Sequence, residues 1–244
     1  MIKKERLDKI LANMGYGSRK DVKKLIKEGR VEIDGNIQHR NDIKLDPYNA
    51  NIRIDNRTVI YRKYIYLMMN KPKGVVSSTE DPMNRTILDL LDEKDLVFKP
   101  FPAGRLDKDT EGLLLLTNDG KLAHEILSPK KGIGKTYYAE INGLIDENHV
   151  VEFKKGLILD DGYKTLPSNL EILESGNYSR IKITIHEGKF HQIKRMFETF
   201  GMRVMYLKRI SMGKLELDKD LGLGEYRELD EREIKLLKEN NRSL

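Results

Sequence analysis

The amino-acid sequence predicts an α+β protein of two domains, a small one with helices and a hairpin and a larger one rich in strands. Two amphipathic helical patterns open the chain, and alternating, strand-like segments follow them. From residue 61 onward, short strand-like segments alternate with helical ones. A charged connection over residues 56–64 separates the two regions. We therefore expect domains at residues 1–60 and 61–244.

Composition excludes several classes of protein. The sequence has no cysteine, which excludes disulfide and thiolate chemistry, and no apolar run approaches the length of a membrane helix. The N-terminus leads into an amphipathic pattern rather than an apolar signal core, so we expect a cytoplasmic protein with no membrane partner. Five scattered histidines show no metal-ligand spacing. Without a nucleotide or metal motif, we expect no cofactor and no metal.

The net charge of +6 is concentrated at the N-terminus. Residues 1–30 contain ten basic and four acidic side chains, which account for the whole excess. Such a concentration is typical of a module that binds a polyanion.

Two helices and a hairpin are expected in this basic region. Apolar spacing over residues 7–14 predicts the first helix, and Ser18 with Asp21 three residues later predicts the start of the second. Alternation over residues 31–36 and 52–56 predicts two strands. We expect the basic side chains of the second helix to contact phosphates: Arg19, Lys20, Lys23, Lys24 and Lys27. A solvated helix face is the alternative, but their place in the unit that carries all the net charge favours phosphate contact.

The two helices and following hairpin, over residues 4–36, resemble an S4 RNA-binding domain. This resemblance implies binding through backbone phosphates and RNA shape, with a strong dependence on salt. We expect the domain to dock the protein on RNA and to perform no chemistry.

Residues 104–120 are the most informative segment. Four consecutive leucines at 113–116 predict a strand buried on both faces, closed by the turn residues 117–120. A buried strand that holds a charged loop is well suited to position a reactive group. The preceding loop carries one basic and three acidic side chains: Arg105, Asp107, Asp109 and Glu111.

Two other interpretations of this loop compete with a catalytic one. The spacing of Asp107, Asp109 and Glu111 is similar to the start of an EF-hand loop, which requires a bidentate Glu at its twelfth position. This chain has Asn118 there, so calcium binding is rejected. Solvated loop charges stay open on spacing alone.

Residues 104–107 and 110–120 resemble the active-site motif of the bacterial pseudouridine synthases that modify ribosomal RNA, and more narrowly the small-subunit (16S) type. The resemblance implies that the second domain is a mixed, mainly antiparallel sheet with flanking helices. It also implies covalent catalysis by Asp107 on a flipped-out uridine.

Two shorter motifs carry the same resemblance. Asn-Lys-Pro-x-Gly at residues 70–74, which we expect as a turn after a strand over 64–69, resembles the first motif of the family. This resemblance implies that Lys71 lines the RNA cleft. An ordinary exposed loop lysine is the alternative. Lys-x-Tyr at residues 135–137 implies that Tyr137 stacks on the base and transfers a proton. A core tyrosine is the alternative.

Residues 187–197 form the second strong motif. The aromatic and apolar residues at helical spacing define one helix face: Phe190, Ile193, Phe197 and Phe200. Lys194 lies at the border of this face, where a partly desolvated ammonium needs a carboxylate partner. The resemblance places a basic residue here beside the nucleophile, so we expect an ion pair between Lys194 and Asp107. The wider family usually has Arg at this position, and a lysine cannot form the bidentate ion pair that Arg makes with a carboxylate. The alternative to the ion pair is that Lys194 extends into solvent.

The resemblance further implies a set of substrate-binding residues: Arg105, Lys71, Ile193 and Leu207. Arg105 would hold a phosphate or fill the space left by the flipped base, and Leu207 would pack in the pocket. Further strands are expected at residues 135–141, 168–174 and 179–186. Further helices are expected at 122–127 and 146–155, with a last one capped by Asp230.

The resemblance thus implies isomerisation of uridine to pseudouridine in ribosomal RNA, and we expect a monomeric enzyme. The expected substrate is 16S rRNA or an assembling small subunit. The same chemistry on 23S rRNA is one alternative. A non-catalytic rRNA-binding or assembly protein is the other, although it would not need Asp107, Tyr137 and Lys194 together.

Overall fold

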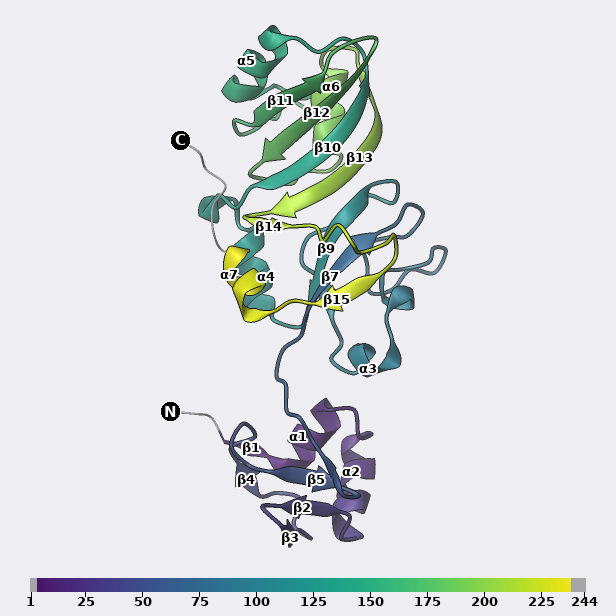
Figure 1. Cartoon of the computed structure of the whole chain (residues 1–244), viewed down its shortest axis with the longest axis vertical. Coiled ribbons are helices and arrows are strands. Elements are labelled where there is room, and N and C mark those ends of the chain that lie inside the picture. The colour runs from purple at the N-terminus through teal and green to yellow at the C-terminus, as the bar shows by residue number, and fades with distance from the viewer. Residues whose placement is uncertain (1–3, 238–244) are drawn as a thin grey trace. The chain divides into compact units, whose positions relative to one another are not determined.

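The structure, a computed structural model, describes residues 4–237. The chain divides into two compact units (Figure 1). Unit 1 comprises Met1–Ile65 and Asp92–Pro100, and unit 2 comprises Tyr66–Leu91 and Phe101–Leu244. The segment 92–100 therefore belongs to unit 1 by its contacts, although unit 2 flanks it in sequence. The domain limits 1–60 and 61–244 stay a proposal.

Unit 1 packs two helices against a four-stranded sheet. Its core consists of apolar residues from the helices, such as Leu11 and Ile26, and from the strands, such as Ile52. Ser18 and Asp21 form the expected capping box at the start of the second helix. The helices are α1 (Leu7–Asn13), α2 (Arg19–Lys27) and, in the second segment, α3 (Glu93–Leu96). The sheet has the order β3 (Asn36–Ile37), β2 (Val31–Ile33), β5 (Ile52–Ile54) and β6 (Arg57–Thr58), while β1 (Glu5–Arg6) pairs with β4 (Lys44–Leu45).

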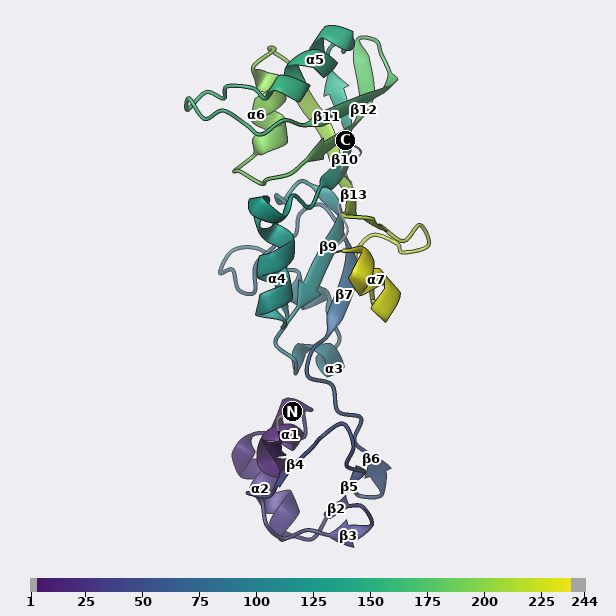
Figure 2. The same cartoon turned by 90° about the vertical axis from the view of Figure 1, so that its left-hand side faces the viewer.

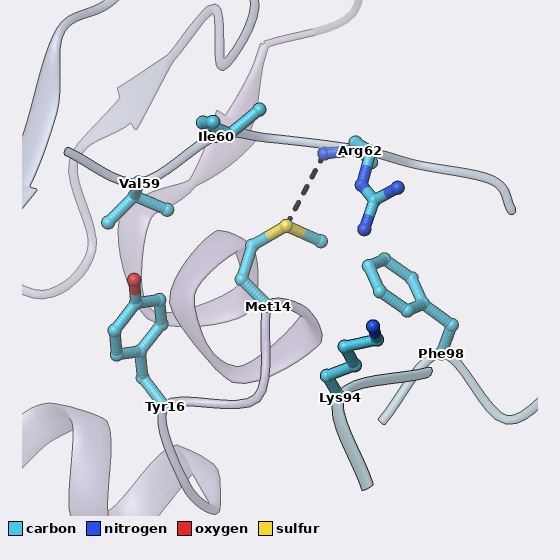
Figure 3. A pocket seen from close by; sticks show the side chains of 7 residues that line it. All are labelled: Met14, Tyr16, Val59, Ile60, Arg62, Lys94 and Phe98. Carbon is cyan, nitrogen blue, oxygen red and sulfur yellow. Dashed lines mark hydrogen bonds between the residues drawn. The ribbon is translucent and has the colours of Figure 1, made fainter. Parts of the chain in front are cut away.

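A pocket of about 330 Å³ lies in unit 1 at the end of α1 (Figure 3). The backbone N–H of Arg62 donates to Sδ of Met14 at 3.3 Å, and the Arg62 guanidinium lies 5.3 Å from the ring centroid of Phe98. These contacts join the last residues of the first segment to helix α1 and to the segment 92–100.

Unit 2 is a nine-stranded mixed sheet with helices beside it. Within the described part of this unit, β9 and β13 are the one parallel pair of named strands and the other pairs are antiparallel. The main path runs β11 (Asn169–Glu174), β12 (Tyr178–Ile185), β10 (Lys135–Asn142), β13 (Arg203–Met212), β9 (Glu111–Thr117), β7 (Tyr66–Lys71) and β15 (Tyr226–Glu228). Off this path, β8 (Phe101–Pro102) pairs with β9 and β14 (Leu215–Glu216) pairs with β13. The predicted α+β class with a mixed, mainly antiparallel sheet is confirmed.

The helices of unit 2 follow the sequence pattern closely. They are α4 (Gly120–Leu127), α5 (Glu147–Lys155), α6 (Gln192–Glu198) and α7 (Glu231–Leu236), with short 3₁₀ turns at Leu88–Leu90 and Pro129–Lys131. Asp230 caps α7 as expected. One expectation was wrong: Phe190 precedes α6 and is 76% exposed, so it does not share the buried helix face of Ile193 and Phe197. Within residues 4–237, none of the helices combines the length and apolar composition that crossing a membrane requires.

The strands β10, β12 and β13 give the sheet two different faces. Along β10, Tyr137 and Ala139 are buried, whereas Thr136 and Tyr138 are partly exposed, because successive side chains point to opposite faces. Helices α5 and α6 cover the first side, which we call the helix face, and the loop after β13 lies on the other, the open face (Figure 2). The two helices touch each other through the rings of Phe153 and Phe197.

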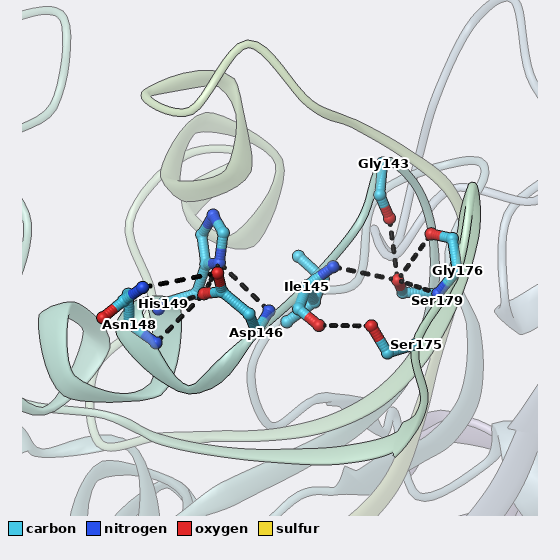
Figure 4. Close-up of polar contacts among 8 residues, drawn as sticks. All are labelled: Gly143, Ile145, Asp146, Asn148, His149, Ser175, Gly176 and Ser179. Atoms are coloured by element: carbon cyan, nitrogen blue, oxygen red, sulfur yellow. Dashed lines mark hydrogen bonds and ion pairs between the residues drawn. The ribbon is translucent and has the colours of Figure 1, made fainter.

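Helix α5 is fixed at the end of β10 by polar contacts (Figure 4). The Asp146 carboxylate accepts from the backbone N–H of Asn148 and His149, at 3.0 and 3.3 Å. The buried Ser179 hydroxyl of β12 donates to the Gly143 carbonyl at 2.7 Å and accepts from the Ile145 N–H at 3.1 Å. The helix that covers the helix face is therefore tied to two of the strands beneath it.

Gly112 allows the close approach of β9 to β13. Its φ is +101°, and a Cβ there would lie 2.2 Å from the Arg209 carbonyl oxygen. Only two residue pairs join these parallel strands, and Gly112 belongs to one of them.

We expect Gly112→Ala to lower the free energy of unfolding by about 2 kcal/mol or more, because the added methyl meets backbone and the positive φ is strained. Urea denaturation followed by circular dichroism measures the change. Gly120→Ala is the control, since nothing lies within 4 Å of a Cβ there. An equal, small effect of both substitutions would contradict the close approach.

Lys135, at the start of β10, gives a second prediction. Burial, together with the nearby Arg209 charge, lowers the pKa of its ammonium from 10.5 to about 8. Between pH 8 and 10.5, the Lys135 ammonium is mostly protonated in the unfolded chain and mostly deprotonated in the folded chain. The free energy of unfolding therefore increases as the pH rises. The difference in the free energy of unfolding between the wild type and Lys135→Met should grow in favour of the wild type by up to about 1.4 kcal/mol per pH unit from pH 8 toward 10. The exposed Lys131→Met is the control and should show no such gain; a flat Lys135 difference would contradict the lowered pKa.

Candidate active site

Asp107 lies in the loop between β8 and β9, with a basic side chain near each oxygen of its carboxylate. The Lys194 Nζ is 3.5 Å from Asp107 Oδ2, and the His191 Nε2 is 3.7 Å from Oδ1. The Asp107 side chain is 31% exposed, so solvent reaches it although it is held between neighbours. The expected ion pair between Lys194 and Asp107 is present.

Asp109 shares the same lysine. Lys194 Nζ donates to both Asp109 oxygens, at 2.7 and 2.9 Å, which is closer than its approach to Asp107. Burial raises the pKa of Asp109, but the hydrogen bond and charge of Lys194 outweigh it, so the pKa lies below its ordinary value. Lys194 is therefore a bridge between two carboxylates, and Asp109 fixes its ammonium. Sequence reasoning noted Asp109 only as a loop charge and did not identify His191.

Lys71 corrects another expectation. It neither lines a cleft nor lies exposed, because β7 continues through it and its side chain is fully buried. Its ammonium donates to the backbone carbonyls of Asp107 at 3.0 Å, Thr110 at 2.9 Å and Pro72 at 3.0 Å. Burial lowers the pKa of Lys71 to about 8, against the opposing charges of Asp109 and Asp107. Lys71 thus holds the backbone of the Asp107 loop from beneath.

A second set of contacts fixes the other side of this loop. The Ser77 hydroxyl donates to the Leu106 carbonyl at 2.9 Å, and its oxygen accepts from the Leu106 N–H at 3.1 Å. The Gly74 N–H donates to the Lys108 carbonyl at 2.8 Å. The residues on both sides of Asp107 are therefore anchored to the segment that follows β7.

The start of α6 is equally well supported. His191 adopts a left-handed conformation with φ +49° just before the helix. The buried Glu187 carboxylate accepts from Gln192 Nε2 at 2.9 Å and from the Tyr163 hydroxyl at 2.5 Å. Arg195 pairs with Asp160 and Asp161, the latter at 2.7 Å. These contacts tie the helix that carries Lys194 to the loop after α5.

Tyr137 lies on the helix face, two strands away from the Asp107 loop. It pairs with Arg209 in β13, and Arg209 pairs with Gly112 in β9, so about 10 Å separates the backbones of Tyr137 and Gly112. Tyr137 is 8% exposed, and Arg209 between them is buried, with Nε donating to the Leu113 carbonyl at 2.7 Å.

The remaining expected site residues are placed as follows. Leu207 pairs with Ala139, which puts it on the helix face with Tyr137. Leu207 and Ile193 are buried, and Arg105 is exposed on the loop. The basic residues of α2 in unit 1 are all exposed: Arg19, Lys20, Lys23, Lys24 and Lys27.

Two family models match the chain. The model described as RNA pseudouridylate synthase matches residues 65–199, and the S4 domain model matches residues 5–42. A solved structure titled as a crystal structure of pseudouridylate synthase is 36% identical, with a TM-score of 0.67, and covers 95% of this chain and 99% of its own.

Curated relatives match almost from end to end. An uncharacterized RNA pseudouridine synthase of Bacillus subtilis (strain 168) is 52% identical, covering 96% of this chain and 98% of its own. The ribosomal small subunit pseudouridine synthase A of Vibrio cholerae is 40% identical, covering 94% and 97%. The ribosomal large subunit pseudouridine synthase B of Bacillus subtilis is 37% identical, covering 96% of each. With its fold, its acidic loop and these matches together, the chain belongs to the RNA pseudouridine synthases that carry an N-terminal S4 domain.

Proposed function

We propose that this enzyme converts uridine to pseudouridine in ribosomal RNA, with Asp107 as the covalent nucleophile. The observation that carries the proposal is the Asp107 carboxylate between Lys194 and His191, on a loop that Lys71 anchors. An anchored carboxylate that a cation orients and solvent still reaches is suited to attack a bound nucleoside. A protein that only binds RNA has no need of this arrangement.

The reaction breaks the N-glycosidic bond, turns the base and joins C5 of the base to the sugar. Asp107 holds the nucleoside covalently while the base turns, and Lys194 orients the carboxylate and balances its charge. Tyr137 stacks on the flipped base, and its hydroxyl helps transfer the proton that leaves C5. Ile193 and Leu207 form the apolar wall of the pocket, and Arg105 contacts a phosphate or fills the space that the flipped base leaves. No electrons are exchanged with another molecule, so we propose that the reaction uses no cofactor.

The substrate we propose is 16S rRNA or an assembling small subunit, which the enzyme meets in the cytoplasm as a monomer. The relative named as a small-subunit synthase, at 40% identity, supports this choice. Modification of 23S rRNA is the second candidate, because a large-subunit synthase is 37% identical over the same length. Mapping pseudouridines in both rRNAs from a strain that lacks the protein decides between them: the missing modification identifies the substrate.

The nucleophile is tested by Asp107→Asn. The amide cannot attack, so we expect turnover to fall on the order of 10³-fold or more while RNA binding is unchanged. Tritium release from 5-labelled uridine in rRNA measures turnover, and filter binding measures affinity. Glu198→Gln, an exposed substitution in α6, is the control and should keep full activity. Substantial turnover by Asp107→Asn would remove Asp107 from this role.

The docking role of α2 is tested by reversing three exposed charges together, Lys20, Lys23 and Lys24 to Glu. We expect a higher KM for RNA with kcat nearly unchanged. The slope of log affinity against log salt should become shallower by roughly 2 to 3, because each of the three lost phosphate contacts removes about 0.7 to 0.9 from it. Reversing Lys121, Lys130 and Lys131, all exposed in unit 2, changes the net charge equally and serves as the control. If both triple variants behave alike, α2 has no special role in docking.

A further inference from the structure

The open face of unit 2 carries a cleft that the proposed reaction does not use. Its volume is about 710 Å³, which is within the range of small-molecule sites. Thr136 and Tyr138 of β10, Lys182 of β12 and Lys208 of β13 line it, together with the loop after β13. Tyr137 and Arg209, the neighbours of these residues, point to the helix face, so the cleft and the Asp107 site lie on opposite faces of the sheet.

Asn70 supplies a buried, unpartnered acceptor in this cleft. The residue is 4% exposed, and its Nδ2 donates to the Leu221 carbonyl at 2.8 Å. That carbonyl can only accept, which fixes the orientation of the amide and leaves Oδ1 as the other atom. Within residues 4–237, Oδ1 has no hydrogen-bond partner. Buried polar atoms are normally paired, so Oδ1 retains the capacity to accept from an O–H or N–H donor.

The charges in the cleft favour an anion. Four lysines line it, against two acidic residues: Lys182, Lys208, Lys214 and Lys219, with Glu216 and Asp218. Arg227 already neutralises Asp218 through an ion pair at 2.5 Å, and Lys182 lies 3.7 Å from Glu171. Lys208, partly buried in the cleft, has no ion-pair partner in the described part of the chain. Its ammonium is therefore available to a phosphate.

The spacing between these groups suits one nucleotide. Lys208 pairs with Glu111, and Asn70 pairs with Leu113, two residues further along β9. Strand geometry then places the backbones of Lys208 and Asn70 roughly 12 Å apart. The ring of Tyr138 lies at the same cleft, with its hydroxyl turned to Glu140 at 3.0 Å. The ring offers an apolar surface to a base.

We propose that this cleft binds a ribonucleotide unit, with its phosphate at Lys208, a hydroxyl or N–H donor at Asn70 Oδ1 and its base beside Tyr138. The site is independent of the proposed reaction, because Asp107 and Tyr137 lie on the other face. The nucleotide comes either from a single-stranded RNA segment or from free nucleoside monophosphate. Both sources present the same chemistry to the cleft.

Titration of the full-length, isotope-labelled chain with uridine 5′-monophosphate tests the site, with amide NMR signals of Thr136, Lys208 and Ser211 as the readout. We expect these signals to shift, and to saturate at about tenfold lower concentration with the monophosphate than with uridine. Lys208→Met keeps the apolar stem of the side chain and removes its charge. It should bring the ratio of the saturating concentrations of uridine and the monophosphate to about one. Lys154→Met, an exposed lysine on α5, is the matched control and should leave the ratio unchanged.

The same signals separate the two sources. Saturation by a five-nucleotide oligouridylate at lower concentration than by the monophosphate assigns the cleft to RNA, and saturation by the monophosphate alone assigns it to free nucleotide. Asp107→Asn should leave every cleft shift intact, which keeps this test independent of the nucleophile. Absent shifts at these residues, or a ratio that Lys208→Met does not alter, would overturn the site.

Discussion

The buried ammonium of Lys71 is the interaction on which the candidate active site depends. An ammonium taken out of water loses its hydration, and burial is tolerated only where other oxygens replace that water. Here the backbone carbonyls of Asp107, Lys108 and Thr110 take this role. The charge therefore organises the loop rather than meeting the substrate. These hydrogen bonds hold the surface loop in one conformation, and Asp107 therefore has a fixed position in it.

Lys194 adds orientation to this placement. Its ammonium contacts Asp109 more closely than Asp107, so the lysine does not neutralise the proposed nucleophile fully. A lysine held by a second carboxylate can act as a fixed point charge, which compensates for the two-pronged bond that it cannot form. The supports of α6 at Glu187 and Arg195 keep that charge in position. The site thus separates anchoring, orientation and reaction among different side chains.

Sequence patterns predicted the parts of this molecule that depend on local periodicity. The buried leucine strand, the capping boxes at Ser18 and Asp230 and the Lys194–Asp107 pair all follow from spacing or resemblance. The role of Lys71 did not, because a lysine before a proline looks like a surface turn until its strand partner is known. Asp109 and His191 were also missed as members of the cluster. Their importance arises from contacts between segments about 85 residues apart, which no local pattern records.

The two neighbouring residues Asn70 and Lys71 serve opposite sides of one strand. Asn70 faces the cleft on the open face, while Lys71 reaches under the Asp107 loop. A one-residue insertion or deletion earlier in β7 would exchange the two directions. An insertion would then place the amide beneath the loop, and a deletion would place the ammonium at the cleft. Side chains of this strand can therefore be substituted during evolution, but its length cannot change. Two independent requirements fix that length, the position of Asn70 at the cleft and the position of Lys71 under the Asp107 loop.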